Sequence, residues 1–277
     1  MSPSDKLIIN AAITGGVFTK KDSPFLPVSI VEITDCARRV QDAGAAILHL
    51  HARNLDQSPS YAADVYQGLI RNLRSACGDL IICASLSGRH ISDVNQRSAA
   101  LMARPDMASL TLGSANFVTQ PNINSPDTIQ ELASRIYTSG AIPELEVFDT
   151  GFINYAHYLI KKGVLRPPYY FNIILGSLGS APLDLITLGN MVKLLPEGAV
   201  WAVGGLGRYQ LDANVLGIAA GGHVRVGLED NLYFDRQRAD LADNVRLVER
   251  IVRIARESGR EPATPGEVRR LLGMGNC

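Results

Sequence analysis

The sequence has no excess of either charge and no long hydrophobic run, and both absences exclude classes of protein. Its 277 residues include 27 basic and 27 acidic side chains, so no overall field draws the chain to nucleic acid or to an anionic membrane. Nowhere do about 18 uncharged apolar residues occur together, and the first residues do not form a signal peptide. We therefore expect a soluble, cytoplasmic protein that acts on small molecules.

Paired cysteines and nucleotide-binding motifs are also missing. The four cysteines are Cys36, Cys77, Cys83 and Cys277, and the absence of a CxxC pair argues against a disulfide framework and a thiolate zinc site. We expect reduced thiols, with Cys83 as a small core residue. Without a GKS/T loop or a complete GxGxxG motif, nothing indicates nucleotide hydrolysis or a Rossmann cofactor. The segment 204–208, GGLGR, resembles only part of a phosphate-binding loop.

Short runs rich in Ile, Val and Leu alternate with longer stretches of helical period. This pattern is typical of repeated strand–helix units around a parallel sheet, and eight such units predict an α/β fold, the (β/α)8 TIM barrel. No linker or internal repeat divides the chain, so we expect a single domain over residues 1–277. The predicted strands cover 7–14, 45–52, 80–85, 107–112, 142–148, 170–175, 199–204 and 223–228, and predicted helices include 33–42, 64–76, 128–137, 182–195 and 237–258.

Two histidines end the second predicted strand. His49 and His51 alternate along it, so both imidazoles can face one ion, and imidazole nitrogen is a good ligand for zinc. Two histidines in this spacing are equally compatible with hydrogen-bonded core residues or with phosphate binding. A third ligand is needed to distinguish these alternatives.

The last predicted strand provides a carboxylate at the same end of the barrel. Arg225, Gly227 and Glu229 share one face of it, and the second and eighth strands flank the first in a closed barrel. Glu229 can then complete a metal site with the two histidines. Asp230, within reach of Arg225, can act as a general base beside the metal, which suits enolate chemistry. The alternative is a salt bridge at the rim between Arg225 and a neighbouring acid.

Other polar residues lie at the carboxyl ends of the predicted strands, where barrel enzymes build their active sites. An inward Glu146 on an otherwise apolar strand is costly unless it is paired or used, so we expect it to handle protons or support the site. Hydroxyls and exposed amides can bind a carboxylate, although ordinary turn chemistry also explains them. These substrate-binding candidates are Thr14, Ser85, Ser109, Thr111 and Gly113.

Several motifs, in order along nearly the whole chain, resemble the beta-keto acid cleavage enzymes, the family that includes 3-keto-5-aminohexanoate cleavage enzyme. The matching segments are AAITGG at 11–16, AGAAILHLHAR at 43–53, RPDMASLTLGSANF at 104–117, PELEVFDTG at 143–151, WAVGGLGR at 201–208, GGHVRVGLEDN at 221–231 and the closing ATPGEVRRLLG. The resemblance implies a zinc-containing homotetrameric barrel that converts a beta-keto acid and acetyl-CoA to acetoacetate and a new acyl-CoA.

The resemblance also implies roles for individual positions. His49, His51 and Glu229 match the zinc ligands, and Arg225 and Asp230 match the pair that deprotonates the keto acid. Glu146 matches an acid near the metal, while Ser85 and Ser109 fall where hydroxyls contact the substrate.

The chain departs from amino-keto-acid members of this family at two places. Val17 stands where an acidic residue can hold the substrate ammonium, and valine cannot pair with a cation. The turn 85–89, SLSGR, introduces bulk and a cation where the family has a glycine-rich turn. We therefore expect a substrate whose distal group is neutral, apolar or acidic.

Two other functions remain open at this point. A metal-dependent aldolase or lyase needs the same metal and enolate but no thioester. A noncatalytic metal-binding barrel needs neither a base nor a substrate.

Overall fold

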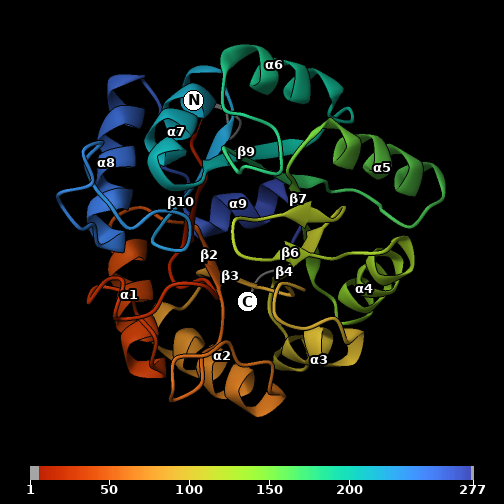
Figure 1. Ribbon diagram of the computed structural model, residues 1–277, viewed down its shortest axis with the longest axis horizontal. Coiled ribbons are helices and arrows are strands. Elements are labelled where there is room, and N and C mark those ends of the chain that lie inside the picture. The colour runs from red at the N-terminus through yellow and green to blue at the C-terminus, as the bar shows by residue number, and fades with distance from the viewer. Residues whose placement is uncertain (1–5, 276–277) are drawn as a thin grey trace.

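The computed structural model describes residues 6–275, and eight parallel strands in it form a closed barrel ringed by helices (Figure 1). The predicted fold class is therefore confirmed, and each predicted strand corresponds to a strand of the barrel. Around the barrel the order is β1-β10-β9-β8-β7-β4-β3-β2. The strands are β1 (Ile9–Ala12), β2 (Ile47–Leu50), β3 (Ile81–Ala84), β4 (Met107–Thr111), β7 (Ile142–Val147), β8 (Tyr170–Leu175), β9 (Val200–Gly205) and β10 (His223–Val226).

Helices follow the strands and pack outside them. Those predicted over 33–42, 64–76, 128–137 and 182–195 are present as α1, α2, α4 and α6. The helix predicted over 237–258 was wrong at its start: α8 begins at Asn244, because Asp243 caps it and Asp235 accepts the amides of Ala239 and Asp240 in a preceding turn. The helices are α1 (Ile30–Asp42), α2 (Ala63–Cys77), α3 (Val94–Ser98), α4 (Pro126–Thr138), α5 (Thr150–Lys161), α6 (Leu185–Leu194), α7 (Gln210–Ala219), α8 (Asn244–Glu257) and α9 (Pro265–Leu271), with 3-10 segments η2 (Ala99–Ala103) and η3 (Gly207–Tyr209).

The two ends of the barrel differ. Val268 and Leu272 pack against Ile8, Ile47 and other inward apolar residues, so α9 closes the amino end. This packing accounts for the position of α9 across the barrel in Figure 1. The opposite, carboxyl end carries the loops after the strands and a short hairpin of β5 (Ala115–Asn116) and β6 (Pro121–Asn122). A pocket opens there.

The barrel strands are buried on both faces, as their continuous hydrophobicity predicted. Glu144 and Glu146 on β7 interrupt the apolar pattern, because they place two carboxylates inside the barrel. Three cysteines, Cys36, Cys77 and Cys83, are free, and Cys277 lies outside the described residues. Within residues 6–275, we find no helix with the length and hydropathy that a membrane span requires.

Candidate metal centre and active site

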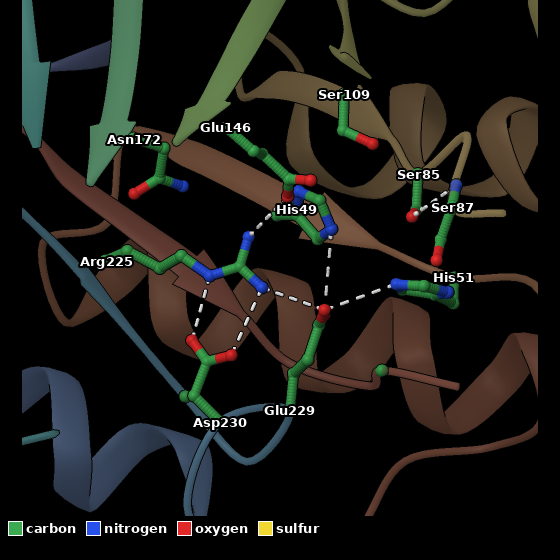
Figure 2. Close-up of polar contacts among 12 residues, drawn as sticks. His49, His51, Ser85, Ser87, Ser109, Glu146, Asn172, Arg225, Glu229 and Asp230 are labelled. Carbon is green, nitrogen blue, oxygen red and sulfur yellow. Dashed lines mark hydrogen bonds and ion pairs between the residues drawn. The ribbon is translucent and has the colours of Figure 1, made fainter. Parts of the chain in front are cut away.

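His49, His51 and Glu229 converge at the carboxyl end of the barrel (Figure 2). Their nearest nitrogen and oxygen atoms lie within 4.8 Å of one another. The Glu229 carboxylate is 3.3 Å from His51 Nε2 and 3.7 Å from His49 Nε2. The side chains come from the end of β2 and from the turn after β10, and both strands pair with β1. The expected proximity of the second and eighth strands is therefore confirmed.

Two glycines shape the backbone that carries Glu229. Gly227 has a φ of 154°, and a Cβ there would lie 2.1 Å from the carbonyl oxygen of Ala12. Gly15 has a φ of 65°, and its missing Cβ leaves space for Glu229 Cγ, which would otherwise be 2.8 Å away. Both positions therefore require glycine, which lets the loop after β1 and the turn after β10 approach closely.

Glu144 orients His49 from inside the barrel. His49 Nδ1 is 2.6 Å from Glu144 Oε2, while the side-chain amides of Asn10 and Asn172 donate to the other carboxylate oxygen at 2.6 and 3.1 Å. A carboxylate on the second nitrogen of a ligating histidine fixes the ring and its tautomer. No role was predicted for Glu144 from the sequence, although its spacing two residues before Glu146, which places both on one face of the strand, was an available signal.

Two groups in the described chain have the composition of a metal site. One consists of His49, Cys83 and Glu144, and the other of His49, His51 and Glu229. In the first, Glu144 is already engaged by His49 and two amides, and burial raises the pKa of the Cys83 thiol well above its usual value. In the second, His49 Nε2 and Glu229 Oε2 are buried without a hydrogen-bond partner. The unpaired atoms make the second group the better fit for a metal.

Arg225 links three carboxylates beside this group. Its guanidinium donates to both oxygens of Asp230 at 2.8 and 3.2 Å, to Glu229 at 2.8 Å and to Glu146 at 3.4 Å. Arg225 is 2% exposed, so these charge-assisted bonds act in a medium of low dielectric. The rim salt bridge considered as an alternative is thus present, but as a buried network that includes Glu229.

The network separates the protonation behaviour of its members. Burial by itself lowers the pKa of His49, but Glu144 and Glu229 outweigh burial and raise the pKa to about 9. Burial alone would raise the pKa of Glu229, yet Arg225 and the two histidines hold it well below its usual value. For Asp230 and Glu146 burial prevails and raises the pKa of each carboxyl. Two of these carboxyls therefore have a more basic character, which suits proton transfer.

The predicted substrate-binding residues occupy different places. Ser85 lines the pocket, and the Ser109 hydroxyl accepts the amide of Leu86 at 3.0 Å. In Figure 2 both side chains lie on the opposite side of the site from Arg225. The Thr111 hydroxyl donates to Glu146 at 2.6 Å. Thr14 is fully buried, and Gly113 is packed against the ring of Phe152, so neither contributes to the pocket wall.

Further residues that line the pocket come from the loops around it. His90 lines it, and its Nδ1 lies 3.1 Å from Gln120 Nε2. Arg89 and Phe117 also line it, and these two come from separate loops. The contact between these two side chains depends on loop geometry, which no local sequence pattern reveals.

The segment 204–208 does not form a cradle of free amides. The amide of Leu206 donates to Leu175, and the amide of Gly207 donates to the carbonyl of Asp230 at 2.7 Å. The segment therefore fixes the backbone of Asp230, which is a different use from the phosphate loop that its sequence resembles.

Comparisons with known proteins find relatives that match nearly the whole chain. The family model described as beta-keto acid cleavage enzyme matches residues 6–274. The 3-keto-5-aminohexanoate cleavage enzyme of Fusobacterium nucleatum is 39% identical over 273 residues, covering 98% of each chain. The 3-oxoadipate:acetyl-CoA acetyltransferase of Cupriavidus necator is 33% identical over 96% of this chain and 94% of that protein.

A solved structure shares the fold. The apo structure of ObcA superposes with a TM-score of 0.77 over 91% of this chain and 66% of its own, at 21% identity. This likeness supports the barrel architecture alone.

Proposed function

Because the chain belongs to the beta-keto acid cleavage enzyme family, we propose that it transfers an acetyl group from acetyl-CoA to a beta-keto acid and then cleaves the product. The products are acetoacetate and the CoA thioester of the remaining acyl group. Two relatives are named as acetyl-CoA-dependent transferases, for 3-oxoadipate and for 3-dehydrocarnitine, which supports this reaction class. The enzyme is accordingly an acyltransferase that cleaves a carbon–carbon bond.

We assign a zinc ion to His49, His51 and Glu229. The observation that carries this assignment is the pair of buried, unpartnered atoms, His49 Nε2 and Glu229 Oε2, which face the same point as His51. Two imidazoles and one carboxylate form a donor set of catalytic zinc sites that leaves a position for substrate. When bound, zinc acts as a Lewis acid on the keto and carboxylate oxygens of the substrate.

Asp230 is the proposed base. Its carboxylate lines the pocket, and Arg225 holds both oxygens, so the side chain has one fixed orientation. Burial raises its pKa, which strengthens it as a proton acceptor. We propose that Asp230 removes a proton from the carbon between the ketone and the carboxylate, while Arg225 stabilises the ionised form before transfer. Glu146, tied to Arg225 and Thr111, is placed to assist proton movement.

The test is an assay of purified, metal-analysed protein with acetyl-CoA and a panel of short beta-keto acids, followed by mass spectrometry. Acetoacetate and a new acyl-CoA should form only when both substrates are present. Asp230→Asn should lower turnover by about 10²- to 10⁴-fold. The exposed Asp240, which pairs with Arg246, provides the matched control Asp240→Asn, which should keep wild-type turnover.

A keto acid cleaved without acetyl-CoA would favour the aldolase alternative. No product with any acid from zinc-loaded protein would favour a noncatalytic barrel.

We also propose that the active form is a cytoplasmic homotetramer. Light scattering after size-exclusion chromatography measures the mass of the assembly.

A further inference from the structure

Arg89 brings a cation without an acidic partner into the site pocket. It lies on the loop after β3 and lines the pocket, as do Ser87 and Val17. Among residues 6–275, Arg89 forms no ion pair, whereas Arg225, the second arginine of the pocket lining, contacts three carboxylates. The positive charge of Arg225 is therefore matched within the protein, and that of Arg89 is not.

The position of Arg89 is fixed by its surroundings. Its guanidinium carbon lies 3.7 Å from the centroid of the Phe117 ring, and Phe117 packs edge-on against Phe148 at 5.4 Å. The carbonyl of Arg89 accepts the side-chain amide of Gln120 at 2.9 Å, which ties this loop to the hairpin. Stacking on an aromatic face leaves the N–H groups at the guanidinium edge free to bind a carboxylate by two parallel bonds.

The pocket is therefore divided in charge. Glu229 and Asp230 cluster around Arg225 at the proposed metal end. Arg89 feels the charges of these carboxylates through space but lies outside ion-pair distance from them. Val17, at the wall of the same pocket, offers no charge to an incoming ammonium group. A ligand that matches this arrangement carries its reacting end at the metal and an anion at the other end.

Building on the proposed function, we infer that the substrate is a beta-keto acid with a second carboxylate at its distal end, and that Arg89 binds this carboxylate. The guanidinium is thus a specificity-determining group. A phosphate of acetyl-CoA shares the same anionic chemistry, so the experiment must separate the two ligands.

The experiment compares 3-oxohexanedioate with 3-oxohexanoate, which has the same carbon chain but lacks the distal carboxylate. Binding of each acid to zinc-loaded protein is measured by calorimetry without acetyl-CoA, and kcat and KM for each substrate are then measured in the full reaction. The variant is Arg89→Gln. Arg166→Gln is the matched control, because Arg166 also stacks on an aromatic ring, that of Tyr137 at 4.4 Å, but is exposed outside this pocket.

Wild-type protein and the control should bind the diacid at least about tenfold more tightly than the monoacid, and Arg89→Gln should remove this preference by lowering diacid affinity about 10- to 100-fold. Equal losses for both acids would overturn the inference, because Arg89 would then act on the common carboxylate. A rise confined to the KM of acetyl-CoA would also overturn it. Absent turnover with intact diacid binding would contradict the proposed function and leave the Arg89 assignment supported.

Discussion

The orientation of His49 depends on the buried carboxylate of Glu144. Both oxygens of this carboxylate form hydrogen bonds. His49 and Arg225 hold the pKa of Glu144 at about 2 against the effect of burial, so the group stays ionised. An ionised Glu144 keeps the proton on His49 Nδ1 and directs Nε2 towards Glu229 and His51. This carboxylate therefore positions His49 at the proposed metal site.

We predict that Glu144→Gln lowers zinc affinity by about 10- to 100-fold. A glutamine has one acceptor oxygen, so its NH2 group must face either His49 Nδ1–H or the amides of Asn10 and Asn172. Competition titration with a chelator measures the affinity. Glu131→Gln, on the exposed face of α4, is the control and should bind zinc like the wild type. Unchanged affinity in Glu144→Gln would contradict the proposed role.

A second prediction at this scale concerns the close contact between Gly15 and Glu229. Gly15→Ala should cost about 1–2 kcal/mol from its positive φ and should also displace Glu229, which lowers zinc affinity at least about tenfold. Gly140→Ala has a similar φ of 85° but nothing within 4 Å of the new Cβ. It should lose similar stability and retain zinc affinity. Equal zinc affinity in the two variants would show that the contact with Glu229 does not matter.

Side chains that act through strand alternation could be predicted from the sequence, and those that act through loops could not. His49, His51 and Glu229 were identified from their positions at strand ends, and the structure places them together. Arg89 and Phe117 meet because two loops fold over the same barrel end, and Glu144 gains importance only from its partners on neighbouring strands. These relations depend on tertiary register, which the sequence pattern does not specify.

Among the secondary-structure elements, the pairing of β1 with β10 closes the barrel and brings Glu229 towards His49. At the amino end of this strand pair, the amide of Ile8 donates to His223 Nδ1 at 3.0 Å, so His223 has a structural role. Its ring must be neutral to accept this bond. Burial, aided by the charge of Arg260, lowers the pKa of His223 to about 3.

This pKa shift predicts the pH dependence of stability. Below the ordinary histidine pKa of 6.5, His223 binds a proton in the unfolded chain, whereas in the folded protein it stays neutral down to about pH 3. The free energy of unfolding therefore decreases as the pH falls from 6.5 to about 3. His223→Asn keeps an acceptor but does not titrate. The free energy of unfolding of this variant is measured by urea titration between pH 6 and 4. Its decrease with falling pH should be smaller than that of the wild type by about 1 kcal/mol per pH unit.

The wild-type protein, measured over the same pH range, is the reference for that experiment. The same slope in His223→Asn would mean that other groups cause the acid sensitivity.

The strands were easier to predict than the helices. Most strands are buried on both faces and appear as largely apolar runs, whereas α8 has a strongly polar outer face that merges with the polar loop before it. The helix begins at Asn244 because Asp243 caps it. Capping depends on backbone geometry as well as on residue type, so the start of the helix was hard to predict from the sequence.

For the whole molecule, the barrel separates the functions of its two ends. The amino end is filled by α9 and by the ion pairs of Asp106 with Arg74 and Arg269. The carboxyl end keeps its polar groups around an open pocket, where loops can vary without disturbing the core. We therefore propose that loop residues such as Arg89 set substrate preference, while the proposed chemistry depends on residues at strand ends.

The most direct test of the central claim is to supply acetyl-CoA labelled with ¹³C in both acetyl carbons, together with an unlabelled beta-keto acid, and to locate the label by mass spectrometry. We predict that acetoacetate carries both labelled carbons, that the new acyl-CoA carries none, and that neither product forms once zinc has been removed by a chelator. Label in the new acyl-CoA, or cleavage of the keto acid without acetyl-CoA, would contradict the proposed acyl transfer.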